Sequence, residues 1–281
     1  MKGMHCVLSL MLIGTAHAGV LEIDDAQFEV NRLSDNLYVV GQDYGSSKIN
    51  FGVLVDDKGV ILISSMMANY APTIEKVVHN LSDKPIKYVL NPDSDPFHHD
   101  ANGYFAERGA TIIAQENMGA AGAFTQVTFD HGLTLNLGDE IISLVHTPAH
   151  TRASSLIKLH KNNVIFTGDA FRNDWLMYSG PNGPKAEIQG LDQAIALADK
   201  DTRFIPGNRS ARAFSTLEEL KKSRDTYQQF AAFVLGMRDR GVAVEDIIAS
   251  AELKQLVSGL ERFDDWQDNI QYHVKDVLAL N

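Results

Sequence analysis

Aspartates and histidines crowd one loop of the chain, residues 91–102, with the sequence NPDSDPFHHDAN. The loop follows the apolar run IKYVL, which is typical of a buried strand. Carboxylate oxygens and imidazole nitrogens are common protein ligands of divalent metals. The same residue types also suit a turn, because Asp and Ser side chains bond to the nearby backbone. The loop therefore raises two hypotheses, a metal site and an acidic turn.

Three further loops carry polar residues directly after predicted strands. Their sequences are HTPAHTRAS after EIISLV, FTGDAF after NVI, and IPGNRSAR after RF. Binding sites in sheet proteins gather at strand ends, where a rigid scaffold holds short loops. Four such loops, rich in His, Asp, Gly and Pro, indicate one shared site.

The elements that must position these loops follow from the apolar periodicity. Strands are expected at 28–34, 37–42, 49–56, 59–64, 86–91, 110–114, 126–129, 134–137, 140–147, 154–160, 163–168 and 203–207. Helices are expected at 71–82, 101–108, 116–122, 187–200, 215–241, 244–256 and 264–280. A capping box from Ser215 to Glu218 is expected to open the first helix of the last third. The pattern favours two packed sheets with helices outside them.

The order and spacing of the four loops resemble the metallo-β-lactamase-fold hydrolases, from about residue 30 to the end of the chain. The motif H-x-H-x-D-H of that family aligns with DSDPFH, and its P-x-H-T, G-D and P-G-H loops align with PAHT, GD and PGN. The residues at the metal-ligand positions of the family are then Asp93, Asp95, Phe97, His98, His150, Asp169 and Asn208. Ser64 stands where the family often has an Asp at the end of an early strand.

The resemblance implies an α+β fold, a four-layer αββα sandwich with a metal site between the sheets and a helical C-terminal extension at 214–281. It also divides the ligand positions between two metals: Asp93, Asp95 and His150 for the first, Phe97, His98 and Asn208 for the second, and Asp169 between them. Phe97 has no donor atom, and it replaces a carboxylate that orients the attacking water in many members. We therefore do not expect a two-metal, water-activating site.

Three carboxylates in one cleft repel each other unless a positive charge lies among them. Oxygen donors favour a hard ion such as Mn²⁺, Mg²⁺ or Ca²⁺, whereas a mixed Asp/His set also suits one Zn²⁺ or Fe²⁺. Alternatively, Arg152, Arg172 or Arg209 takes the place of the metal, because each lies beside one of the loops. Two outcomes for the cofactor stay open: one divalent metal (Zn, Mn or Fe), or none.

The first 18 residues have the three regions of a secretory signal peptide: Lys2, the apolar run CVLSLMLIG, and the small residues of AHA at the cleavage site. Residues 19–281 would then form the exported domain, periplasmic or secreted, without the single cysteine of the chain, Cys6. The apolar run is too short to span a membrane as a helix. The formal net charge of -11 argues against nucleic acid or an anionic membrane as a partner.

Three functional hypotheses follow. The first is an exported protein with an altered metal centre, weak or lost dizinc hydrolase activity, and a cavity that binds a small-molecule ligand or a partner. The second is a mononuclear metal-dependent hydrolase of an ester, thioester, lactone or lactam, with His98 as a general base. The third is a structural or interaction protein in which Arg–Asp pairs replace the metal.

Overall fold

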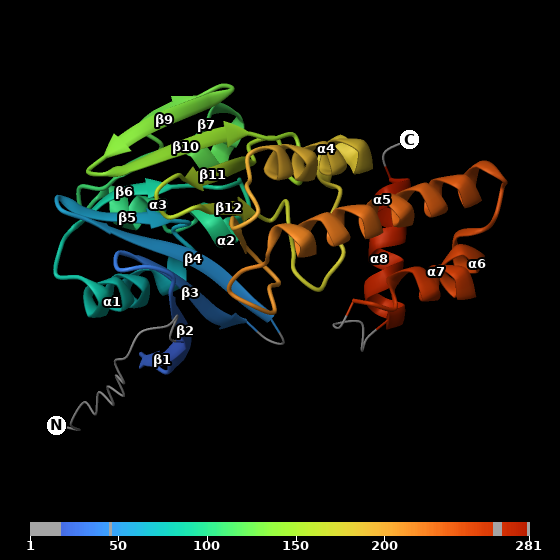
Figure 1. The fold of residues 1–281 in the computed structure, drawn as a ribbon, viewed down its shortest axis with the longest axis horizontal. Helices are drawn as coiled ribbons and strands as arrows, with labels where there is room; N and C mark the ends of the chain where they lie inside the picture. Colours follow the sequence, from blue (N-terminus) through green and yellow to red (C-terminus); the bar gives the residue numbers. More distant parts are fainter. Residues whose placement is uncertain (1–17, 45–46, 261–265, 280–281) are drawn as a thin grey trace.

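The computed structural model describes residues 18–44, 47–260 and 266–279. The predicted signal peptide lies outside these ranges, except for its last residue, Ala18. Two β-sheets face each other, and helices cover their outer faces (Figure 1).

The first sheet holds eight strands in the order of the chain. They are β1 (Ala18–Ile23), β2 (Ala26–Arg32), β3 (Leu37–Tyr44), β4 (Ser47–Asp56), β5 (Gly59–Ile63), β6 (Ile86–Leu90), β7 (Thr111–Gln115) and β8 (Val127–Phe129). Neighbouring strands are antiparallel from β1 to β5 and parallel from β5 to β8. Strand β1 has no counterpart among the predicted strands.

The second sheet has five strands in the order β13-β12-β11-β10-β9. They are β9 (Gly132–Leu137), β10 (Glu140–His146), β11 (Ser155–Leu159), β12 (Val164–Gly168) and β13 (Arg203–Pro206). Only the pair β12 and β13 is parallel. Both strands therefore end at the same edge of the sheet, where their loops meet.

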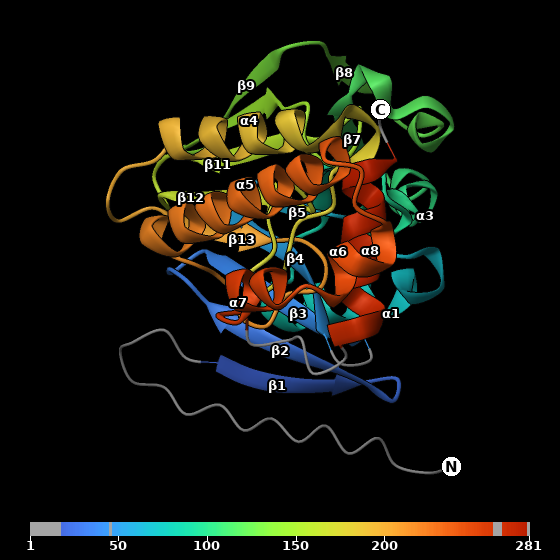
Figure 2. The ribbon, with the colours of Figure 1, turned by 90° about the vertical axis from the view of Figure 1, so that its right-hand side faces the viewer.

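The first four α-helices lie between strands in the chain, and the last four follow the last strand. They are α1 (Ala71–Leu81), α2 (Pro96–His99), α3 (Asn102–Ala106), α4 (Gly183–Ala196), α5 (Leu217–Asp239), α6 (Val244–Ala249), α7 (Ala251–Val257) and α8 (Trp266–Leu278). Figure 1 shows α5, α6, α7 and α8 grouped at one end of the molecule, and this end faces the viewer in Figure 2. The described helices include none with both the length and the apolar character needed to cross a membrane.

Apolar side chains form three separate layers of core. The layer between the first sheet and its helices includes Phe28, Val53, Ile74, Val77 and Phe105. The layer between the two sheets includes Leu54, Ile63, Ile142, Ile157 and Ile205. The layer between the second sheet and α4 and α5 includes Ile165, Leu191, Phe204, Tyr227 and Phe230. This layering confirms the predicted αββα sandwich with a helical C-terminal extension.

The predicted capping box at the start of α5 is wrong by one residue. The backbone of Ser215 exchanges two hydrogen bonds with Phe204, at 2.8 and 2.9 Å, so it stays in an extended conformation. Thr216 is the N-cap instead, and its hydroxyl accepts a hydrogen bond from the backbone N–H of Glu219. Pairing with β13 thus decides where the helix begins.

Two other predicted helices differ from the structure in their bounds. The helix predicted at 244–256 is divided at Ser250, which has an extended ψ of 129° and caps α7 with its side chain. The helix predicted at 187–200 begins four residues earlier, with a Pro in its first turn, and ends at Ala196. Pro favours a first turn because its fixed φ suits a helix start.

Candidate metal centre

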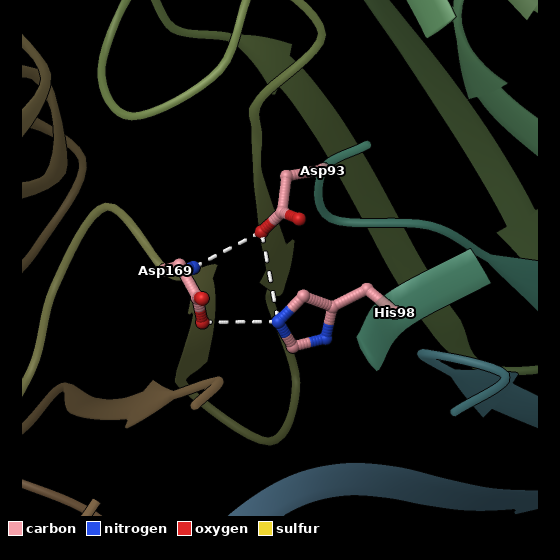
Figure 3. A group of neighbouring side chains, drawn as sticks. All are labelled: Asp93, His98 and Asp169. Atoms are coloured by element: carbon pink, nitrogen blue, oxygen red, sulfur yellow. Dashed lines mark hydrogen bonds and ion pairs between the residues drawn. The ribbon is translucent and has the colours of Figure 1, made fainter. Parts of the chain in front are cut away.

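The four predicted loops meet at one edge of the sandwich. Asp93 and Asp95 follow β6, His98 lies in α2, His150 follows β10, Asp169 follows β12, and Asn208 follows β13. Figure 3 shows three of these side chains pointing toward one another: Asp93, His98 and Asp169. The structure therefore brings together residues that are far apart in the chain; Asp93 and Asn208 are 115 positions apart.

Two glycines make the close approach of these loops possible. Gly168 has a φ of +53°, and a Cβ at this position would lie 2.5 Å from Asp93 Oδ2. A Cβ on Gly207 would lie 2.7 Å from Asp169 Oδ1 and 2.6 Å from the ring of His98. All three distances are below a normal contact, so only glycine fits without a shift of the acidic and imidazole groups.

Asp93 connects two of the loops through the backbone. Its Oδ1 accepts a hydrogen bond from the N–H of Asp95 (2.9 Å), and its Oδ2 accepts one from the N–H of Asp169 (3.0 Å). The side chain is fully buried, and burial raises the pKa of its carboxyl group. Asp93 thus holds the two loops together and also offers a donor atom for a metal.

His98 is hydrogen-bonded through both ring nitrogens. Its Nε2 lies 3.0 Å from Asp169 Oδ1 and 3.7 Å from Asp93 Oδ2, and its Nδ1 lies 2.9 Å from Ser64 Oγ. Burial alone lowers the pKa of His98, but the charges of Asp93 and Asp169 outweigh burial and raise the pKa to about 9. Ser64 therefore keeps a bond to the ring at the position where the family often has Asp.

His150 faces a second pair of carboxylates. Its Nε2 lies 3.0 Å from Asp95 Oδ2 and 3.7 Å from Asp169 Oδ2. Burial lowers the pKa of His150, but the hydrogen bond with Asp95 and the charge of Asp169 outweigh burial and raise the pKa to about 9. The same contact acts on Asp95: burial raises its pKa, and the bond to His150 brings it below the usual value.

Asp169 divides its two oxygens between different neighbours. Oδ1 accepts hydrogen bonds from His98 and from the N–H of Asn208, which is 2.7 Å away. Oδ2 is buried and has no hydrogen bond within the described residues. Burial raises the pKa of Asp169, but the charges of His98 and His150 hold it well below its usual range.

Two groups of three donors fit a cation. One is Asp93, His98 and Asp169, and the other is Asp95, His150 and Asp169; the donor atoms of each group lie within 4.8 Å of one another. The groups differ in access. His98 and Asp93 are fully buried, whereas Asp95 and His150 line a cavity of about 700 Å³.

The last two predicted ligand positions, Asn208 and Phe97, make contacts of other kinds. The amide oxygen of Asn208 accepts a hydrogen bond from the N–H of Arg209 at 2.6 Å, so the side chain closes its own turn. Phe97 packs against the core of the first sheet and lines the cavity. The assignment of Asn208 as a ligand stays a prediction.

All three arginines named from the sequence line the cavity, but they differ in burial. Arg152 and Arg209 are exposed, and Arg172 is 7% exposed. Arg172 Nη2 lies 3.8 Å from Asp169 Oδ2, which is an ion pair without a hydrogen bond. Arg172 is the guanidinium that approaches the carboxylates.

Sequence reasoning missed Glu187, which lies behind His150. Glu187 is fully buried in α4, and its Oε2 accepts a hydrogen bond from the N–H of His150 at 2.8 Å. Burial raises the pKa of Glu187 to about 8. The bond holds a residue whose φ is +60°, which a His rarely adopts. The helical spacing of Glu187 with the buried Leu191 and Ala194 was the available signal.

The wall of the cavity includes two residues of α8. Tyr272 stacks on Tyr178 with ring centroids 5.6 Å apart, and Tyr178 contacts the ring of His150 edge-on at 5.7 Å. His273 also lines the cavity, and its Nδ1 lies 3.1 Å from the carbonyl oxygen of Met177. The helical extension therefore takes part in the site.

Comparisons with known proteins give a likeness in structure alone. No protein-family model and no curated protein matches the chain. A metallo-β-lactamase from Pontibacter korlensis superposes with a TM-score of 0.62 at 14% identity, covering 72% of this chain and 99% of that one. The metallo-β-lactamases IND-7 and DIM-1 each give 0.60, at 16% and 13% identity; they cover 70% and 72% of this chain and 98% and 97% of their own.

Proposed function

We propose, from the metallo-β-lactamase fold of this chain, that it is an exported protein with an altered metal centre. In this proposal one divalent cation binds at Asp95, His150 and Asp169. Ordinary dizinc hydrolysis is weak or lost, and the cavity beside the centre binds a small-molecule ligand.

The observation that carries the proposal is the free oxygen of Asp169. Oδ2 is buried and without a hydrogen bond in the described part of the chain, and it lies near His150 Nε2 and Asp95 Oδ2. A buried carboxylate oxygen is costly to leave unbonded, so this position suits a cation. Two carboxylates and one imidazole are donors for Zn²⁺, Mn²⁺ or Fe²⁺.

The position of a second cation offers much less. Both oxygens of Asp93 already accept backbone N–H groups, and both nitrogens of His98 are hydrogen-bonded. Asn208 directs its oxygen at the backbone, and Phe97 has no donor. A second ion at this position would share both oxygens of Asp93 with backbone N–H groups and would replace the hydrogen bond between His98 and Asp169, with no further unbonded carboxylate oxygen to receive it. This supports a one-metal centre.

One observation favours the rival hypothesis of a mononuclear hydrolase. Asp95 and His150 line the cavity, so a substrate there would reach a bound cation, which supplies carbonyl polarisation and a more acidic water. The rival also needs a base. His98 is buried and does not line the cavity, so its role as general base stays a prediction without an observed route to substrate.

Turnover separates the two hypotheses. Protein purified from the periplasm, loaded with Zn²⁺ or Mn²⁺, would be assayed against esters, thioesters, lactones and lactams. We expect no turnover above the level of a His150→Ala control. Metal-dependent turnover that His150→Ala abolishes would replace the proposal with the mononuclear hydrolase.

Export is tested separately, because it rests on the sequence of residues 1–18. We expect the full chain to appear in the periplasm with residues 1–18 removed, as read from the mass of the intact protein. A chain that lacks residues 2–18 should stay in the cytoplasm. Full-length protein of unprocessed mass in the cytoplasm would contradict the proposed export.

A further inference from the structure

The backbone of His150 has a conformation that residues other than glycine rarely adopt. Its φ is +60°, whereas Asp95 and Asp169, the other two donors of the proposed centre, have no positive φ. From this backbone the imidazole Nε2 lies 3.0 Å from Asp95 Oδ2. A strained residue keeps such a conformation only where the surrounding structure holds it. The contacts of the His150 backbone therefore control the direction of its ring.

Glu187 holds the N–H group of this residue. Its Oε2 accepts a hydrogen bond from the backbone N–H of His150 at 2.8 Å, and its Oε1 has no hydrogen bond within the described residues. The side chain is fully buried in α4. Because a buried carboxyl group costs free energy unless it is hydrogen-bonded, this contact is the one that favours Glu over an apolar residue here.

A glycine contacts the carbonyl group of the same residue. Gly180 has a φ of +62°, and a Cβ on it would lie 1.7 Å from the carbonyl oxygen of His150 and 2.6 Å from the carbonyl carbon. No side chain fits at this position, so the two backbones are in direct contact. The backbone of His150 is therefore held at its N–H by α4 and contacted at its carbonyl group by the loop that contains Gly180.

Helix α8 fixes this loop in place. Asp276 Oδ2 accepts a hydrogen bond from the backbone N–H of Ser179 at 2.7 Å, and His273 Nδ1 lies 3.1 Å from the carbonyl oxygen of Met177. Both α8 side chains are buried, so water competes little for these bonds. The helical extension thus anchors the loop that contacts the candidate ligand.

We propose that Glu187 and Asp276 are positioning residues of the metal centre. Glu187 fixes the N–H of His150, and Asp276 fixes the loop at its carbonyl group. Together they keep the imidazole directed at Asp95 and Asp169, although neither is one of the three donors. The inference rests on the one-metal centre of the proposed function, and it assigns the helical extension a part in cation binding.

Two variants of Glu187 separate positioning from packing. The dissociation constant for Mn²⁺ or Zn²⁺ is measured by isothermal titration calorimetry. Glu187→Leu has a similar volume without an acceptor, and it should bind the cation roughly 10- to 100-fold more weakly than the wild type, because partners that orient a ligand have effects of this size. Glu187→Gln keeps an oxygen for the N–H of His150, so it should bind with nearly wild-type affinity.

Asp276 provides an independent test, because it acts through the loop. Asp276→Leu should also weaken cation binding, by less than Glu187→Leu, and Asp276→Asn should restore it, because Asn keeps an acceptor for Ser179. The control is Gln126→Leu. Gln126 Oε1 accepts the backbone N–H of Ile112 at 2.6 Å, and this residue is neither a donor nor part of the cavity wall. Its variant loses a bond of the same kind and should keep the affinity of the wild type.

A second measurement follows the ring of His150 without a metal. In nuclear magnetic resonance spectra of ¹⁵N-labelled, metal-free protein, the imidazole signals that His150→Ala removes belong to this ring. Glu187→Gln should keep their chemical shifts. Glu187→Leu should change them, because the ring is no longer held beside Asp95.

The results distinguish the inference from the function on which it rests. A wild type that binds no cation contradicts the proposed centre, and unchanged imidazole shifts in Glu187→Leu would then overturn the positioning role as well. One equivalent bound at wild-type affinity in both Leu variants overturns the inference alone, as does an equal loss in Glu187→Leu and Glu187→Gln. If neither Leu variant folds, Glu187→Asp takes their place. Its shorter side chain withdraws the acceptor from the N–H of His150, and undiminished cation affinity in this variant would overturn the inference.

Discussion

Asp169 is the residue on which the account of the site depends. One oxygen is held by His98 and by the backbone of Asn208, and the other is free of hydrogen bonds among the described residues. The two oxygens of this carboxylate therefore have different roles. Oδ1 fixes the loops, and Oδ2 remains available to a cation beside Asp95 and His150.

At the same scale, we predict that Ser64→Ala destabilises the protein. His98 has a pKa of about 9, so at neutral pH its Nδ1–H donates to Ser64 Oγ. Removing the hydroxyl leaves a buried N–H without an acceptor, which costs about 1–3 kcal/mol of unfolding free energy. Urea denaturation measures the loss.

The matched control is Ser258→Ala, because Ser258 is exposed and its hydroxyl donates only to a nearby carbonyl oxygen. Its change in unfolding free energy should stay within about 0.5 kcal/mol. Equal stability losses for Ser64→Ala and Ser258→Ala would mean that the bond to His98 contributes nothing.

The sequence allowed the residues of the site to be predicted, but not the use of their atoms. Loop order and spacing, through their resemblance to the metallo-β-lactamase fold, led us to expect Asp93, Asp95, His150 and Asp169 near one another. Asp93 accepts hydrogen bonds from two backbone N–H groups, and the side chain of Asn208 accepts one from the N–H of Arg209. These bonds depend on the conformation of the loops, which pack closely at Gly168 and Gly207. Hydrophobic pattern and residue type do not predict these hydrogen-bond and contact distances.

At the scale of elements, the sequence predicted most strands and helices, and it erred where tertiary contacts decide. The capping box was expected at Ser215 because Ser–x–x–Glu occurs one residue before Thr–x–x–Glu. The pairing of Ser215 with Phe204 selects the second. Strand β1 was missed because it begins at Ala18, the last residue of the predicted signal peptide, and pairs with β2 only after the chain turns back.

The shift of the N-cap from Ser215 to Thr216 gives a prediction about α5. Thr216→Ala removes the N-cap and should lower the unfolding free energy by about 0.5–2 kcal/mol. Ser215→Ala should have little effect, because Ser215 Oγ is buried without a hydrogen-bond partner in the described structure. Thermal denaturation of the two variants compares them directly. A larger loss of stability for Ser215→Ala than for Thr216→Ala would contradict this prediction and indicate that Ser215 is the N-cap.

A second prediction at this scale concerns pH and α8. Burial, together with the charges of Arg172 and Arg209, lowers the pKa of His273 to about 3. In the unfolded chain His takes up a proton near its ordinary pKa of about 6.5. The contribution of His273 to stability is therefore complete above pH 6.5 and is lost as the pH falls toward 3, by about 2 kcal/mol between pH 6.5 and 5.

The measurement is the unfolding free energy of the wild type and of His273→Asn across this range of pH. The variant should lose less stability than the wild type on acidification, because Asn does not titrate. Parallel profiles for the wild type and His273→Asn would contradict the prediction.

At the scale of the whole molecule, the two sheets and the helical extension build one site together. The edge of the sandwich supplies the donors of the candidate centre, and α8 supplies Tyr272 and His273 to the cavity wall. An acidic protein thus contains a cavity with a cationic side and an aromatic side. A one-metal centre beside this cavity suits the binding of a ligand, and it suits catalysis equally well.

The most direct test of the account is the metal content of the purified protein after equilibrium dialysis against Zn²⁺ or Mn²⁺. We predict one equivalent per chain in the wild type and in an Asp100→Asn control, whose side chain accepts a hydrogen bond from Ala68 outside the centre. Asp95→Asn should bind none. Two equivalents in the wild type, no metal at all, or one equivalent that survives Asp95→Asn would contradict the proposed one-metal centre.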